Sequence, residues 1–198
     1  MSSLVPRSTV QRLLQPPVLL LARLGVHPNH LTVLGTAGGI GAGALAAAGQ
    51  LLPAGVLLLA ASALDMLDGA LARATGRATR FGSVFDAVMD RLSEGGVLFG
   101  IAYYLSGQGE RDGVLLALAA VIASFLVSYV RARAEIVGIP LAEGLFARPE
   151  RVLLLGVGLI IGQVETALWV LAVAAGLTAL QRLILAWRRS GGDRSDTP

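Results

Sequence analysis

The chain has 198 residues, of which 55% are hydrophobic and only 15% are charged, and its mean hydropathy is +0.71. A soluble domain normally has about a quarter of its residues charged, so the composition favours a protein with several membrane spans. The sequence contains no cysteine, which excludes disulfides and thiolate metal sites. Its isoelectric point near 10.2 would suit a nucleic-acid-binding protein. The basic residues lie between apolar runs, however, so we expect no nucleic-acid partner.

The N-terminal segment is expected to lie on the membrane surface. Arg7 and Arg12 are followed by Pro16 and Pro17 before any long apolar core develops, which is unlike a cleavable signal peptide. We predict an amphipathic segment over residues 1–28, in which residues 9–24 contact the membrane.

Six apolar segments follow, and they predict an all-α polytopic domain with six transmembrane helices over residues 29–189. The segments cover residues 31–48, 51–72, 82–105, 113–135, 149–162 and 166–187. Most approach the ~20 residues that cross about 30 Å of hydrocarbon. The fifth is shorter, so we expect one of its ends to lie in a polar cavity. The polar residues 190–198 predict a disordered tail.

The distribution of arginine orients these spans, because every basic residue of the chain is an arginine. If the N-terminus is cytoplasmic, six alternating spans place all the arginines except Arg111 on or near the cytoplasmic side, as the positive-inside rule requires. A five-span chain would place the C-terminal arginine cluster outside. We therefore expect a multi-pass protein of the cell membrane with both termini in the cytoplasm.

Four aspartates lie within or at the edge of two of these apolar segments. Asp65 and Asp68 share one face of a helix, and Asp86 and Asp90 share one face of the next helix. Each would cost about 2.5–3.5 kcal/mol at the centre of a span, so their charge must be compensated. The short connection over residues 73–81 brings the two helix ends together. The pattern predicts a site for two divalent cations, Mg²⁺ or Mn²⁺, which could bridge a pyrophosphate.

Neighbouring residues also suit an anionic ligand. Gly69 and Gly82 leave room for a phosphate close to the helix backbone, and Arg73 offers a planar guanidinium. The alternative is that the aspartates form salt bridges with Arg73, Arg80 or Arg91. Ion pairing would leave the clustered acids facing too few bases, so we favour the metal site.

The aspartates belong to a longer pattern of eight residues at fixed spacing. It reads Asp65-x2-Asp68-Gly69-x2-Ala72-Arg73-x8-Gly82-x3-Asp86-x3-Asp90. This pattern resembles the complete signature of the CDP-alcohol phosphotransferases. The resemblance implies six transmembrane helices, a homodimer and a site for two divalent metal ions at the cytoplasmic face. It also implies that the first three aspartates bind metal, and that Asp90 both binds metal and acts as the general base.

The resemblance extends to the binding site of a CDP-linked lipid. The stretch Pro28-Asn29-His30-Leu31-Thr32 is similar to a nucleotide-contacting element of the family. The residues expected to bind CDP-diacylglycerol are Asn29, Thr32, Gly69, Arg73 and Thr79.

Three further stretches, residues 128–135, 148–151 and 181–183, are similar to the actinobacterial phosphatidylinositol phosphate synthases within this family. That likeness implies that inositol 1-phosphate accepts the phosphatidyl group and that CMP is released. The residues expected to bind the acceptor phosphate are Ser128, Arg131, Arg151 and Arg182. Arg131 stands where lysine is common in that subfamily, which replaces a point charge by a planar fork.

Two alternatives remain at this stage. The same chemistry could use glycerol 3-phosphate, another polyol phosphate or an archaeal-type lipid donor. A divalent-cation channel or transporter would instead predict charged residues along a path through the membrane, and inverted repeats. All four acids lie near one membrane face and the sequence shows no such repeat, so an enzyme is favoured.

Overall fold

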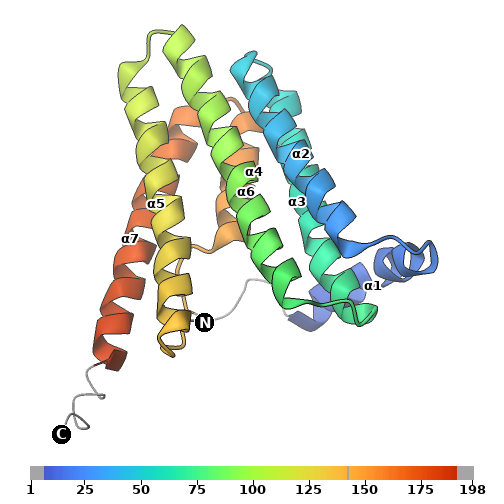
Figure 1. Ribbon diagram of the computed structural model, residues 1–198. Helices are drawn as coiled ribbons and strands as arrows, with labels where there is room; N and C mark the ends of the chain where they lie inside the picture. The colour runs from blue at the N-terminus through green and yellow to red at the C-terminus, as the bar shows by residue number, and fades with distance from the viewer. Residues whose placement is uncertain (1–6, 142, 191–198) are drawn as a thin grey trace, which may run out of the picture.

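The computed structural model describes residues 7–141 and 143–190. The predicted tail therefore lies outside the described residues except for Ser190, and so do the first six residues of the predicted N-terminal segment. Seven α-helices make up the described part (Figure 1). They are α1 (Arg7–Arg23), α2 (Pro28–Ala47), α3 (Leu51–Ala74), α4 (Arg80–Gly107), α5 (Arg111–Ile136), α6 (Arg148–Ile160) and α7 (Val164–Ser190).

Four of these helices, α2, α3, α5 and α7, are long and apolar enough to cross a membrane. The described chain is thus all-α and fits a membrane protein. Helix α4 has 28 residues but carries charged side chains along its first half, and α6 has only 13 residues. The predicted count of six spans depends on these two helices and stays a prediction.

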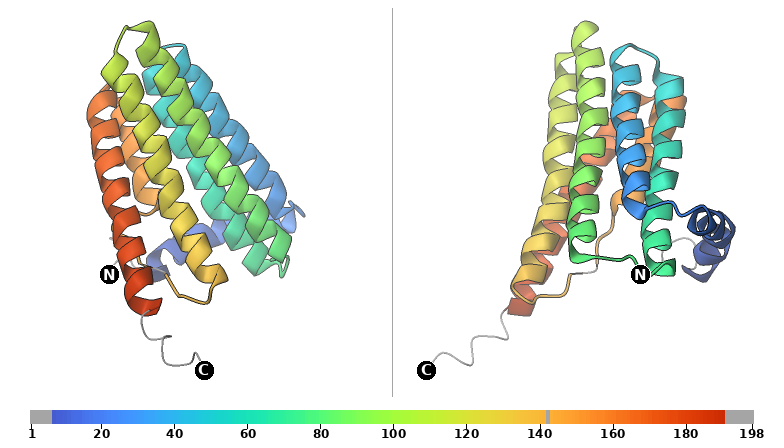
Figure 2. Two further views of the ribbon diagram at one scale, coloured as in Figure 1. Left: turned by 60° about the vertical axis from the view of Figure 1, so that its left-hand side comes forward. Right: turned by 45° about the vertical axis from the view of Figure 1, so that its right-hand side comes forward.

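Helix α1 lies across the lower end of the bundle and packs against α3 (Figures 1 and 2). Val18 of α1 is buried in a small cluster with Leu31 and Leu71, whereas Leu19 and Leu20 are more than half exposed. The helix starts two residues before the predicted segment of residues 9–24 and ends one residue before its end. These leucines leave apolar surface on α1, and the contact of this segment with a membrane surface stays a prediction.

Small residues let α2 pack closely against α3 and α4. Gly35, Gly39 and Gly43 are buried on one face of α2. A Cβ atom at Gly39 would collide with the Ser93 hydroxyl, and one at Gly43 would collide with the carbonyl group of Gly96 in α4. The close approach supplies van der Waals contact between the helices, which is what stabilises bundles in a lipid environment.

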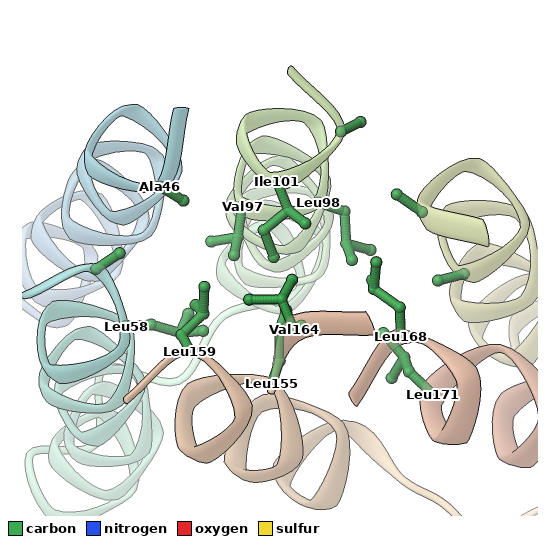
Figure 3. Close-up of a cluster of buried hydrophobic side chains, with 14 of the residues drawn as sticks. Ala46, Leu58, Val97, Leu98, Ile101, Leu155, Leu159, Val164, Leu168 and Leu171 are labelled. Carbon is green, nitrogen blue, oxygen red and sulfur yellow. The ribbon is translucent and has the colours of Figure 1, made fainter. Parts of the chain in front are cut away.

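The apolar core lies where α3, α4, α6 and α7 meet (Figure 3). Leu58, Ile101 and Leu168 are almost fully buried there. Large exposed side chains such as Leu118 and Ile122 face outward from α5, as expected for helices surrounded by hydrocarbon.

Helix α6 is short because an irregular segment takes up part of the height of the bundle. After α5 ends, residues 137–141 and 143–147 rise along the bundle before α6 begins (Figures 1 and 2). Gly138 makes the turn out of α5 with a φ of +77°, a conformation that favours glycine. Helix α6 therefore begins part-way up the bundle rather than at its lower end.

Candidate functional site

The four aspartates lie in the second half of α3 and the first half of α4. Asp68 is almost fully buried, and the side chains of Asp65 and Asp90 are only 8% and 15% exposed. The charge of Asp86 acts on the other three carboxylates, so all four share one electrostatic environment. The expected convergence of two helical pairs is therefore seen, with both helices packed on α2.

The donor set suits a hard divalent cation, because it consists of carboxylate oxygens. One of these oxygens, Asp65 Oδ1, is buried and has no hydrogen-bond partner among the described residues. A Cβ at Gly35 would fall on this oxygen, so glycine is needed there to leave the carboxylate its place. Within residues 7–141 and 143–190, no three Asp, Glu or His side chains lie as close together as the ligands of a bound metal ion do.

Arg148, the first residue of α6, lies among these carboxylates. Its Nη2 is 2.8 Å from Asp65 Oδ2, and its Nη1 is 2.8 Å from Asp90 Oδ1. Arg91 contributes a second positive charge, with Nη1 3.7 Å from Asp90 Oδ2. The alternative of salt bridges is thus realised in part: Arg91 pairs with Asp90 as that alternative named, and Arg148 rather than Arg73 or Arg80 makes the closer contacts.

The start of α2 is fixed against α3 by a hydrogen bond to the site. Pro28 opens α2, and the ring nitrogen Nδ1 of His27 accepts a hydrogen bond from the Asn29 backbone N–H. One turn later, the Thr32 hydroxyl donates to Asp68 Oδ2 at 2.5 Å. This contact holds one oxygen of Asp68 and places the polar edge of α2 beside the acidic cluster.

A pocket of about 200 Å³ opens beside Asp68 and Asp86, between the start of α2, the end of α3 and the start of α4. All the residues expected to bind the CDP-linked lipid line it, namely Asn29, Thr32, Gly69, Arg73 and Thr79. Thr79 also caps α4, because its hydroxyl accepts a hydrogen bond from the backbone N–H of Gly82 at 2.9 Å. The structure therefore brings residues far apart in sequence to one concave surface.

The residues expected to bind the acceptor phosphate come from α5, α6 and α7. Arg151 and Arg182 are buried, Ser128 is half-buried and Arg131 is exposed. The charges of Arg131 and Arg151 both act on Arg182, so these three cationic groups are brought near one another.

Each of these arginines also has a partner within the protein. Arg151 makes two contacts with the buried carboxylate of Glu94, at 2.7 and 3.0 Å. Arg182 donates to the backbone carbonyls of Glu143 and Val127 at 2.9 and 2.6 Å. Arg131 pairs with Glu135 at 2.8 Å.

Sequence reasoning missed two residues of this site. Glu94 lies one turn beyond Asp90 in an apolar segment, so the rule that identified the aspartates could also have identified it. Arg148 was named only as part of a motif. Nothing in its local sequence shows that it contacts two aspartates, one of them 83 positions away.

Comparison with known proteins shows the family of the chain. Residues 25–187 match the family model described as CDP-alcohol phosphatidyltransferase. The phosphatidylinositol phosphate synthase of Mycobacteroides abscessus is 38% identical over 92% of the chain and 87% of its own length. The archaetidylinositol phosphate synthase of Pyrococcus horikoshii is 38% identical over 85% of the chain and 88% of its own length.

The fold is also similar to a solved structure. The crystal structure of phosphatidylinositol phosphate synthase from Mycobacterium tuberculosis with CDP-DAG bound gives a TM-score of 0.84 at 32% identity. The similarity covers 94% of this chain and 98% of that one. A second crystal structure of the same enzyme, in complex with manganese and citrate, gives the same TM-score.

Proposed function

The chain belongs to the CDP-alcohol phosphatidyltransferase family, and from that premise we propose that it transfers the phosphatidyl group of CDP-diacylglycerol to inositol 1-phosphate. CMP is the second product. The observation that carries this proposal is the pocket in which all five residues of the expected lipid-nucleotide site stand beside Asp68 and Asp86. The names of the inositol phosphate synthases at 38% identity support the choice of acceptor.

In this proposal the pocket holds the CDP end of the lipid donor. Asn29, Thr32 and Thr79 offer polar groups to the nucleotide, and Arg73 pairs with the pyrophosphate. Gly69 keeps the wall of the pocket free of a side chain. The mycobacterial structure with CDP-DAG bound supports this use of the fold.

Asp65, Asp68, Asp86 and Asp90 would hold two Mg²⁺ ions, or Mn²⁺ in their place. The ions would supply positive charge that stabilises the pyrophosphate and the departing CMP. The carboxylate donor set and the unpartnered Asp65 Oδ1 support the assignment. The manganese complex of the mycobacterial enzyme supports the use of a divalent cation.

The reaction is a single displacement at the phosphorus that carries the diacylglycerol. A carboxylate oxygen of Asp90 takes the proton from the acceptor hydroxyl as its oxygen forms the new P–O bond. The bond between this phosphorus and the bridging oxygen breaks, and CMP leaves with the electron pair. Arg73 offsets the charge that grows on the bridging oxygen.

The acceptor phosphate would be bound by Ser128, Arg131, Arg151 and Arg182. A phosphomonoester carries nearly two negative charges at neutral pH. The positive charges of Arg131 and Arg151 both act on Arg182, which supports a cationic site for such an anion. Glycerol 3-phosphate and other polyol phosphates carry the same charge and would fit the same phosphate site, so the acceptor must be tested directly.

For the whole protein we propose six spans, cytoplasmic termini, a place in the cell membrane and a homodimer. The lower end of the bundle in Figure 1 holds the end of α3, the start of α4 and the ends of α5 and α7. These ends carry most of the arginines, whereas Arg111 begins α5 at the opposite end. This asymmetry supports the cytoplasmic assignment of the lower end and of the active site.

Purified protein should convert CDP-diacylglycerol and inositol 1-phosphate to CMP and a phosphorylated inositol lipid in the presence of Mg²⁺. CMP release is measured by chromatography and the lipid by mass spectrometry. In parallel reactions, free inositol or glycerol 3-phosphate replaces inositol 1-phosphate as the acceptor. Faster turnover with either of them than with inositol 1-phosphate would refute the assigned acceptor.

A further inference from the structure

The guanidinium of Arg148 joins two carboxylates that belong to different helices. Nη2 lies 2.8 Å from Asp65 in α3, and Nη1 lies 2.8 Å from Asp90 in α4. The side chain is only 24% exposed, and Nε is buried without a hydrogen-bond partner among the described residues. Burying a cation in this way is unfavourable unless nearby anions compensate it, so the two aspartates account for its position.

Arg91 is a second arginine near Asp90, and its contacts differ from those of Arg148. It carries the same charge near Asp90, but its Nη1 lies 3.7 Å from the carboxylate and donates to the Ala87 carbonyl at 2.6 Å. Arg91 therefore adds positive charge to the site without covering a carboxylate oxygen. Arg148 covers one oxygen of each of two aspartates.

We propose that Arg148 is an internal counter-ion of the metal site, and that its guanidinium and a divalent cation compete for the carboxylates of Asp65 and Asp90. The inference rests on the proposed metal-dependent function. The clustered carboxylates need positive charge whether or not a cation is bound, and the planar guanidinium can serve two of them together. A cation bound to these carboxylates would lie beside the guanidinium and repel it, so cation binding displaces Arg148.

The small cavity behind Arg148 offers the displaced side chain no second position. The cavity that Arg148 shares with Glu94 and Arg151 has a volume of about 10 Å³, which is enough for a water molecule and too little for a guanidinium. Glu94 is already paired on both of its oxygens with Arg151. We therefore expect displacement to move Arg148 away from this cavity and to expose it.

The test compares Arg148→Gln with Arg91→Gln in a titration with Mn²⁺ alone, followed by electron paramagnetic resonance of the free ion. Each variant removes one positive charge near the site, but only Arg148→Gln frees carboxylate oxygens. We expect Arg148→Gln to bind Mn²⁺ at least about tenfold more tightly than the unaltered protein. Losing one charge-assisted hydrogen bond that competes with the cation corresponds to at least about a tenfold change in affinity. Arg91→Gln should tighten binding by less than about threefold. Equal tightening in both variants, or no tightening in Arg148→Gln, overturns the inference.

Asp86→Asn separates this inference from the metal proposal, because the two contacts of Arg148 do not involve Asp86. If Asp86→Asn loses Mn²⁺ binding but Arg148→Gln binds Mn²⁺ with unchanged affinity, the counter-ion inference is overturned and the metal-site proposal is not. Absence of Mn²⁺ binding in the unaltered protein overturns both.

If Arg148→Gln does not fold, the unaltered protein still provides a test. Phenylglyoxal should modify Arg148 several-fold faster in Mn²⁺ than in EDTA, as located by mass spectrometry. An equal or slower rate in Mn²⁺ overturns the inference.

Discussion

Replacing Glu94 with Gln removes one charge from the buried ion pair that links α4 to α6. The side chains of Glu94 and Arg151 are 6% and 2% exposed, and two short contacts join them. Removing one partner leaves a charge buried without its counter-ion, which typically costs about 3–5 kcal/mol. For a chain of this size the expected fall in melting temperature is on the order of 10 °C.

Glu135→Gln is the matched control. Glu135 also pairs with an arginine, Arg131, at 2.8 Å, but both side chains are about half exposed. An exposed pair contributes about 0–1 kcal/mol, so the control should melt close to the unaltered protein. Tryptophan fluorescence of detergent-solubilised protein can follow both transitions, because Trp169 and Trp187 lie in α7.

A double variant tests whether the pair is also needed for function. Glu94→Gln with Arg151→Met removes both charges and should recover most of the lost stability. It should remain defective with inositol 1-phosphate, because Arg151 is proposed to bind its phosphate. If Glu94→Gln melts within about 2 °C of the unaltered protein, or loses no more stability than Glu135→Gln, the energetic argument is wrong.

Three further predictions concern the reaction. Asp90→Asn should reduce turnover by at least about 10²–10⁴-fold while CDP-diacylglycerol binding is largely kept, and near-normal turnover would refute its role as the base. Exhaustive chelation with EDTA should abolish CMP release and added Mg²⁺ or Mn²⁺ should restore it; full activity in EDTA contradicts the metal site. Arg131→Ala and Arg182→Ala should each lower kcat/KM for inositol 1-phosphate about ten- to a hundredfold, measured as CMP release, without weakening CDP-diacylglycerol binding. Weaker lipid binding instead would show that these arginines were wrongly assigned.

The sequence determined the parts of this protein that depend on local pattern. Apolar segments of about span length predict helices, and the described chain is all-α. The spacing of Asp65, Asp68, Asp86 and Asp90 placed two carboxylates on each of two successive helices, and the short connection between these helices predicted that the pairs lie at the same end of the bundle. The family signature followed from the same spacing and agrees with the family match over residues 25–187.

Other features could not be read from the chain because they depend on contacts between distant residues. Arg148 reaches Asp65 across 83 positions, and Arg151 reaches Glu94 across 57. No local periodicity encodes the partner of a charged side chain; the packing of α6 against α3 decides it. The short length of α6 was visible in the sequence, but only the tertiary structure showed that residues 137–141 and 143–147 rise along the bundle and carry Arg148 to the carboxylates.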